Sequence, residues 1–365
     1  MLQFTVSIIM IVGTIVVFLQ IRFAKNRPVG YNRDGLVMIQ PNSNDIHQHF
    51  DAVKDELIKT GMVAEVAESE MPATKVLGTA GNFSWKDKDP ALAVNFPVPG
   101  VSYNYGQTVG WQFKEGRDFS KDFATDSAAL VLNESAVNFM GLKKPVDETI
   151  MWDGKPFRVI GVIKDMIMES PYAKARPSIF FLDANYGDIV NIRISPTVSI
   201  HTALASIEAI FKKYNPDEPF DYKFASEEYA KKFADEERIG RLVSFFATLA
   251  IFISCLGIFG LASFVAEQRT KEIGVRKVLG ASIFNVWVLL SKDFILLVFI
   301  SFIIATPLAY YFMHNWLQNY EYRIRISWWI FVVTCGGALL VTLFTVCFQA
   351  IKAAIANPVK SLRTE

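Results

Sequence analysis

Residues 269 to 282 read Arg-Thr-Lys-Glu-Ile-Gly-Val-Arg-Lys-Val-Leu-Gly-Ala-Ser, a short charged stretch between two long apolar runs. No charged residue occurs from Leu242 to Val265 before it, or from Phe294 to Trp316 after it. At about 1.5 Å per helical residue, each run is long enough to cross a hydrocarbon core of ~30 Å. The charged stretch is therefore predicted to be a tight loop at one membrane face.

The loop has a helical pattern of its own. Apolar residues recur at helical spacing from Val275 to Leu290. Gly280 can end a first helix in the left-handed conformation, and Ser282 can cap the start of a second. We predict a short helix, a Gly-Ala break and a long helix that re-enters the membrane; an ordinary loop solvated by its charges is the alternative. The charged residues suit a cytoplasmic face: Glu267, Arg269, Lys271, Glu272, Arg276 and Lys277.

Two further runs complete a set of four predicted spans. Leu2 to Ile21 is the first, and Ile326 to Phe348 is the fourth. A cleaved signal peptide is the alternative for the first run, but only Met1 precedes it and no good cleavage site follows it. Lys292 and Asp293 precede the third span, which suggests that the first turns of its helix lie in the membrane surface; a buried proton relay is the sharper alternative.

Composition agrees with a chain that is part membrane bundle and part soluble domain. Of the 365 residues, 52% are hydrophobic and 20% are charged, too apolar for an ordinary soluble protein and too charged for a pure bundle. The net charge of +1 argues against a nucleic-acid partner. All three cysteines lie inside predicted spans, so the soluble part can form no disulfide of its own.

Residues 22 to 241 are predicted to form one α+β domain inserted between the first two spans. Helices are expected at Ile46–Thr60 and Ile200–Tyr214, and a helical stalk at Ser226–Arg241 is expected to lead directly into the second span. Asn133 and Gly141 should cap a short helix, Asp153-Gly154 should turn a hairpin, and residues 81–100 should form a long loop. Strands are expected at residues 36–39, 63–68, 128–132, 149–152, 157–163, 178–182 and 189–194.

The sequence contains no recognisable catalytic motif. The sequence contains neither a P-loop nor a Gly-x-Ser-x-Gly elbow, so it predicts no ATP site or serine nucleophile. His47 and His49 are two residues apart on a predicted helix and should point to different sides, which makes them poor metal ligands together. We therefore predict a non-enzymatic chain with no cofactor and no metal.

Two motifs resemble those of the MacB–FtsX family of ABC-transporter permeases. The first is similar to the family's Arg-x-x-Glu-Ile-Gly-x-Arg-Lys-x-Leu-Gly-Ala run, with matches at Arg269, Glu272, Ile273, Gly274, Arg276, Lys277, Leu279, Gly280 and Ala281. The second is similar to its closing Ala-Ala-x-x-Asn-Pro-Val-x-x-Leu-Arg, with matches at Ala353, Ala354, Asn357, Pro358, Val359 and Leu362. Within the soluble part, Glu115–Phe119 and Phe157–Asp165 also resemble the family's extracytoplasmic core.

The resemblance implies a function and a topology. The first motif would be the coupling helix that lies on a separate ABC ATPase subunit, with two permeases, identical or different, pairing with two ATPases. Residues 22–241 would be extracytoplasmic, made of a porter-like part and an inserted β-rich lobe, with residues 1–21 and 242–365 in a bacterial inner membrane. Boundaries between the two parts are expected at residues 81–100 and 186–188. Positive charges flank both faces almost equally, so the cytoplasmic side of the loop and tail rests on the resemblance.

Two expectations remain open at this stage. A membrane-anchored sensor or scaffold without an ATPase would also have four spans and a large outer domain, but it would not explain the two motifs. The family's first span usually follows an amphipathic helix, whereas here Gln3-Phe4-Thr5 begins at once. Because some long members carry two four-span units and this chain resembles the second, we expect a half-permease or a shortened gene model.

Overall fold

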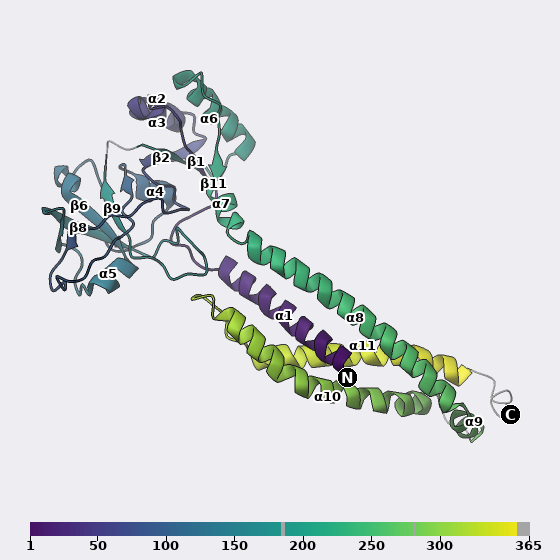
Figure 1. The fold of residues 1–365 in the computed structure, drawn as a ribbon. Coiled ribbons are helices and arrows are strands. Elements are labelled where there is room, and N and C mark those ends of the chain that lie inside the picture. Colours follow the sequence, from purple (N-terminus) through teal and green to yellow (C-terminus); the bar gives the residue numbers. More distant parts are fainter. Residues whose placement is uncertain (184–186, 280–281, 356–365) are drawn as a thin grey trace. The chain divides into compact units, whose positions relative to one another are not determined.

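A computed structural model describes residues 1–183, 187–279 and 282–355. The chain divides into two compact units. The helical unit comprises Met1–Asn26 and the chain from Ala234 onward, and the sheet domain comprises Arg27–Phe233. Figure 1 shows long helices in the first and a twisted sheet with short helices in the second.

The helical unit confirms the four predicted spans. Among the described residues, four helices are long and apolar enough to cross a membrane. Each helix extends beyond the apolar run that predicted it, because charged and polar residues continue the helix past the hydrocarbon length. Their bounds are α1 Leu2–Lys25, α8 Ala234–Gln268, α10 Ile283–Leu317 and α11 Trp328–Ile355.

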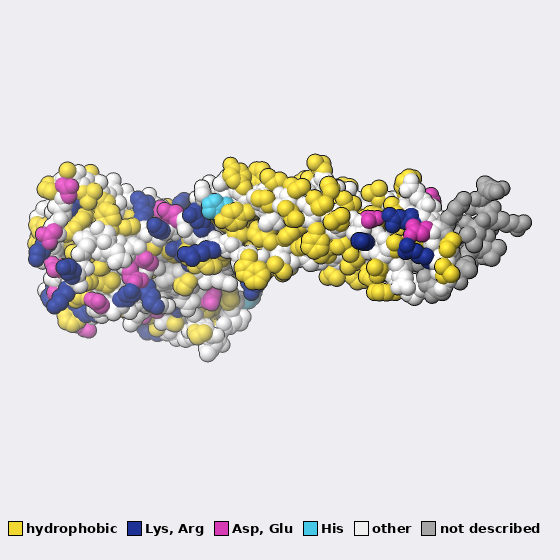
Figure 2. All heavy atoms as spheres, turned by 90° about the horizontal axis from the view of Figure 1, so that it is seen from below, with side chains coloured by type: hydrophobic (Ala, Val, Ile, Leu, Met, Phe, Trp, Pro, Cys, Tyr) yellow, Lys and Arg dark blue, Asp and Glu magenta, His cyan; other side chains and the backbone are white. Residues whose placement is uncertain are grey.

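The four helices pack against one another through mainly apolar side chains. α1 packs against α8 and α10, while α11 packs against α10 and α8. Ile8, Val12 and Val16 of α1 are fully buried against side chains of α10 and α11. The opposite faces expose many large apolar side chains, and Figure 2 shows a bundle surface that is almost entirely hydrophobic. In a spanning bundle such faces contact lipid, because a lipid tail is as apolar as a leucine side chain.

Two polar contacts fix the bundle at specific points. The hydroxyls of Ser7 and Ser254 lie 2.9 Å apart between α1 and α8. The buried Gln20 amide donates to the Tyr322 carbonyl and accepts from the Ile324 amide, each at 2.9 Å. Gln20 thereby ties the loop between α10 and α11 to the last turns of α1.

One half of the sheet comes from the two ends of the sheet domain. The strand order there is β11-β1-β10-β2, and every neighbouring pair is antiparallel. Three helices cover this half, and its core includes Val53, Leu57, Ile192 and Ile207. The elements are β1 Leu36–Ile39, α2 Asp45–Gln48, α3 Phe50–Lys59, β2 Val63–Ser69, β10 Ile189–Ile194, α6 Ile200–Tyr214 and β11 Lys223–Phe224.

The other half of the sheet is built from the middle of the segment. The order continues β4-β9-β6-β8-β7-β3, and β5 pairs with β8. Its core includes Phe83, Phe96, Leu130 and Val159. The elements are β3 Phe83–Ser84, β4 Gly100–Val101, α4 Tyr105–Val109, β5 Phe113–Gly116, η1 Ala124–Ala128, β6 Ala129–Asn133, α5 Glu134–Met140, β7 Thr149–Trp152, β8 Lys155–Ile163 and β9 Ile179–Leu182.

Predictions from capping and turn residues are confirmed. The Asn133 side chain accepts from the Ala136 amide at the start of α5, and Gly141 ends that helix with φ of 69°. Asp153 and Gly154 both have positive φ, as a two-residue hairpin turn requires.

Three local predictions are wrong. The helix expected at residues 46–60 is split, because His49 leaves the helical region between α2 and α3. The helical stalk expected at residues 226–241 is broken, since α7 (Ala225–Lys231) ends where the side chains of Lys232 and Phe233 bind the sheet domain. The expected loop at residues 81–100 contains β3 and ends in β4; the domain boundaries placed near it stay a prediction.

Gly116 and Gly141 form a matched test of backbone strain. Both have positive φ, but a Cβ on Gly116 would overlap the Ile160 carbonyl oxygen, whereas nothing lies within 4 Å of one on Gly141. We expect Gly141→Ala to cost about 1 kcal/mol of stability and Gly116→Ala several times as much. Thermal unfolding of the full chain in detergent measures both, and equal losses would contradict the overlap.

Candidate functional site: the helix between the second and third spans

The predicted short helix is present as α9, Thr270–Val278. The Arg269 amide donates to the Val265 carbonyl, and the Ile273 amide donates to the Arg269 carbonyl, at 3.0 and 2.9 Å. Backbone bonding of the helical type therefore continues across the bend between α8 and α9. After residues 280 and 281, the Ser282 side chain accepts from the Asn285 amide, which confirms the predicted cap of α10.

One apolar side chain anchors α9 to the bundle. Ile273 is 4% exposed, although its described neighbours Glu272, Val275 and Arg276 are exposed. Ile273 belongs to one buried cluster with described side chains of three long helices: Ile258, Ala262, Leu290, Phe294 and Val346. Because these residues belong to α8, α10 and α11, a displacement of α9 would disturb the packing of all three helices.

Two ion pairs lie at this end of the bundle. Arg269 contacts Asp293 of α10 at 3.0 Å, and Arg276 contacts Glu272 one turn earlier in α9 at 2.7 Å. All four side chains are at least one-third exposed, so each pair contributes at most a few tenths to about 1 kcal/mol. Arg276 is thus held loosely and can exchange its partner for another acceptor.

The outward surface of α9 mixes charge with apolar area. Leu279 is 80% exposed and Val275 is 49% exposed, next to the exposed pair of Arg276 and Glu272. Figure 2 shows charged side chains gathered at this end of an otherwise apolar helical unit. An exposed leucine among charges suits contact with a protein surface more than contact with lipid.

Other predicted site residues are only partly described. Lys271, Gly274 and Lys277 belong to α9, but the two lysine side chains and the surroundings of Gly274 lie outside the described structure. The remaining predicted positions lie outside the described residues altogether: Gly280, Ala281, Asn357, Pro358 and Val359. The site residues as a set stay a prediction.

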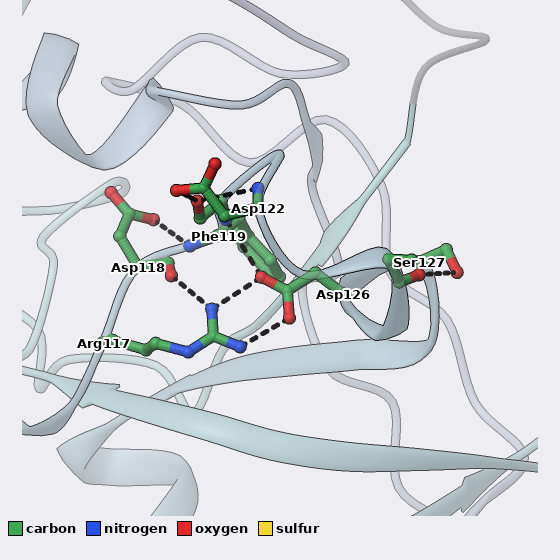
Figure 3. Close-up of polar contacts among 8 residues, drawn as sticks. Arg117, Asp118, Phe119, Asp122, Asp126 and Ser127 are labelled. Atoms are coloured by element: carbon green, nitrogen blue, oxygen red, sulfur yellow. Dashed lines mark hydrogen bonds and ion pairs between the residues drawn. The ribbon is translucent and has the colours of Figure 1, made fainter.

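In the sheet domain, the segment Glu115–Phe119 is organised around a buried carboxylate. Arg117 donates both terminal nitrogens to Asp126, at 2.6 and 2.7 Å, and the Ser120 amide donates to Asp126 at 2.9 Å. Figure 3 shows the guanidinium facing Asp126 while the Asp118 carboxylate turns away toward the Phe119 amide. The Arg117 guanidinium also covers the Phe123 ring at 3.9 Å.

The two carboxylates of this segment differ in their pKa. Burial alone would raise the pKa of Asp126, but the hydrogen bonds from Arg117 and Ser120 outweigh it, and the pKa is lowered. Burial raises the pKa of Asp118 to about 6. A fully paired Asp126 points to a structural role, because its accepting positions are already occupied from within the domain.

The segment Phe157–Asp165 has a structural explanation as well. A Cβ on Gly161 would overlap the Arg117 carbonyl, so β8 needs glycine where the Arg117 turn crosses it. The Asp165 carboxylate accepts from the Ser135 amide and hydroxyl at 2.8 and 2.7 Å, which fixes the first turn of α5. Both motif segments thus position the same half of the sheet.

Some buried polar groups had no signal in the sequence. Glu68 is 4% exposed, lies 3.0 Å from His47 Nδ1, and has a pKa raised by burial to about 7. His49 instead contacts the Asp45 carbonyl, so the two histidines diverge. Within residues 1–183, 187–279 and 282–355, no group of three His, Cys, Asp or Glu side chains could hold a metal ion.

A four-helix apolar unit with a sheet domain between its first two helices defines a multi-pass membrane protein. A family model described as MacB-like periplasmic core domain matches residues 4–210, and one described as FtsX-like permease C-terminal matches residues 244–358. The first match alone spans more than half of the chain. The chain therefore belongs to the MacB–FtsX family of ABC transporter permeases.

Individual relatives are distant. The macrolide export ATP-binding/permease protein MacB of Aggregatibacter actinomycetemcomitans is 27% identical over 202 residues, 51% of this chain and 31% of that protein. The uncharacterized ABC transporter permease YknZ of Bacillus subtilis is 22% identical over 280 residues, 73% of this chain and 70% of that protein. The crystal structure of the periplasmic region of MacB from Actinobacillus actinomycetemcomitans aligns with a TM-score of 0.40 and 16% identity, over 54% of this chain and 92% of that one.

The lengths of these relatives differ from that of the present chain. The chain spans about a third of the length of the MacB protein from Aggregatibacter actinomycetemcomitans. The name of that protein includes an ATP-binding part, whereas no P-loop occurs in this sequence.

Ile273 and Leu279 provide a matched pair for testing how α9 is held. Ile273→Ala removes a buried anchor and should cost about 2–4 kcal/mol of local stability, whereas Leu279→Ala changes an exposed side chain and should cost little. Limited trypsin digestion at Arg269 and Arg276 in detergent reports the loosening. We expect much faster cleavage only for Ile273→Ala, and equal rates in the two variants would show that α9 is not anchored there.

Proposed function

We propose that this chain is the non-catalytic permease subunit of an ABC complex, which couples ATP hydrolysis on a separate subunit to motion of its extracytoplasmic sheet domain. The observation that carries the proposal is α9, a short helix anchored by Ile273 that exposes Val275 and Arg276, with Leu279 exposed directly after its last residue. Its anchor belongs to one buried cluster with residues of α8, α10 and α11, so a partner bound to that face could act on the bundle as a unit.

α8 offers a direct route for such motion. It is a single helix of 35 residues, from Ala234 beside the last residue of the sheet domain to Gln268 beside α9. At about 1.5 Å per residue it is roughly 50 Å long, more than the hydrocarbon thickness. A continuous helix resists compression along its axis, so a push at α9 would be delivered along its length.

The remaining parts of the proposal rest on family membership. The bundle would lie in a bacterial inner membrane, with the N-terminus, α9 and the C-terminal tail in the cytoplasm and the sheet domain outside. Two permeases, identical or different, would pair with two ATPases. Export or pure mechanotransmission are both compatible with α9, and the substrate class is left open.

Arg276 should contribute to partner binding more than to folding. Removing a desolvated interfacial arginine typically costs ~2–4 kcal/mol, or roughly a thirty- to thousand-fold loss of affinity. We expect Arg276→Ala to insert normally but to lose ATPase co-purification and stimulated ATP hydrolysis. Arg158→Ala is the matched control, because Arg158 also forms an exposed ion pair, with Asp147 at 2.6 Å, but in the sheet domain.

Two outcomes would contradict the proposal. If Arg276→Ala and Arg158→Ala both retain wild-type partner yield and coupling, α9 is not the coupling helix. If no ATPase co-purifies even with the wild-type chain, a membrane-anchored sensor becomes the better explanation.

The topology has its own test. Single cysteines at Thr270 and Ser120, in a chain whose native cysteines are replaced, would be labelled in intact cells with a membrane-impermeant maleimide. We expect labelling at position 120 and protection at position 270. The reverse pattern would place α9 outside the cell and remove the basis for an ATPase partner.

A further inference from the structure

The two ends of the sheet domain bind one and the same loop. The chain enters the domain at Arg27 and leaves it at Phe233. Each end has a cationic side chain that donates to backbone carbonyls within residues 165–176, a segment between β8 and β9 that we call the collar.

At the exit, Lys232 binds the collar through its ammonium group. Its Nζ donates to the carbonyls of Met168 and Glu169 at 2.7 and 2.6 Å, and to that of Thr74 at 2.5 Å. The next residue, Phe233, is 1% exposed and packs edge-on against the Tyr172 ring, with centroids 5.7 Å apart. The last two residues of the domain are therefore fixed to the collar by charge and by ring packing.

At the entry, Arg27 makes the equivalent contact. Its Nη1 donates to the carbonyls of Pro171 and Ala173 at 2.9 and 2.5 Å. The Ile167 amide then donates to the Val29 carbonyl at 2.9 Å. Entry and exit are held by neighbouring peptide groups of a single loop.

Burying the Lys232 ammonium group against the collar costs hydration free energy. Burial lowers its pKa to about 8, because an ammonium group loses hydration inside the domain. Three carbonyl acceptors compensate for that loss and use all three N–H donors of the group. An exposed neighbour, Lys231, pairs with Glu228 of the same helix.

Both ends of the collar reach the start of α5. Asp165 accepts from the amide and hydroxyl of Ser135 in the first turn of α5. At the other end, the Arg176 carbonyl accepts from the side chain of Asn133, the residue that caps α5, at 2.8 Å. The collar thus connects the entry and exit residues to one helix N-terminus in the half of the sheet that contains β6 and β8.

We propose that the collar is the joint through which movements of the domain's two membrane connections reach α5 and its half of the sheet. Arg27 and Lys232 are positioning residues in this joint, because they act on α5 through collar carbonyls and not by touching it. The inference rests on the proposed function, in which the sheet domain moves, but the connection from Lys232 to α5 can be measured without an ATPase.

Hydrogen–deuterium exchange of the full chain in nanodiscs tests the connection. Lys232→Met removes the ammonium group, and Lys231→Met is the control for a lost lysine at the same helix end. We expect Lys232→Met to accelerate exchange at least tenfold both in the collar and in the first turn of α5, with α6 unchanged. Lys231→Met should alter none of the three regions.

The outcomes separate the alternatives. Faster exchange that stops within the collar, or no change in it, would overturn the proposal. If α6 also opens, the domain has been destabilised as a whole, and Arg27→Gln then decides, since it acts at the entry and leaves the exit bonds of Lys232 in place. That variant must accelerate exchange in the collar and α5 together; a collar-only effect would again overturn the joint. A loss of ATPase partners in Arg276→Ala has no bearing on these measurements.

Discussion

Backbone hydrogen bonding in hydrocarbon is the constraint on which the helical unit depends. A peptide group in the bilayer core has no water to bind, so a spanning segment must satisfy its own N–H and C=O groups. Three threonines of the bundle follow the same rule: the hydroxyls of Thr14, Thr334 and Thr342 each donate to the carbonyl four residues earlier. The Gln20 side-chain amide is satisfied by hydrogen bonds to two backbone groups of the loop between α10 and α11.

That constraint also locates the candidate site. Since α8 and α10 cannot reverse direction inside the hydrocarbon, the connection between them must lie at a membrane face, where charges and exposed peptide groups are tolerated. Among the described side chains, the buried Ile273 holds α9 there, and the exposed Arg269–Asp293 pair beside it adds little energy. A surface held in this way suits reversible contact, because Arg276 gives up only a weak intrahelical pair when it binds another acceptor.

The sequence predicted what local chemistry controls. Asn133, Gly141, Asp153-Gly154 and Ser282 each act within a few residues, and all four take the predicted conformations. Apolar run length likewise identified the four spans. Pairings between distant segments were not predictable: β10 lies between β1 and β2, and Arg269 meets Asp293 across a helical reversal. The prediction of an unbroken stalk failed for the same reason, since the contacts that Lys232 makes just after α7 come from residues 74, 168 and 169.

The collar shows why some positioning residues leave little trace in a sequence. Arg27 and Lys232 donate to backbone carbonyls, and the residues that supply them in the collar are Met168, Glu169, Pro171 and Ala173. A carbonyl is present whatever the side chain, so these four positions need no common chemistry. Only the donors are chemically specified, and each is a single cation near an apolar span, where a cation is equally expected as a membrane-interface residue. What distinguishes Lys232 is burial, a property that the three-dimensional fold alone confers.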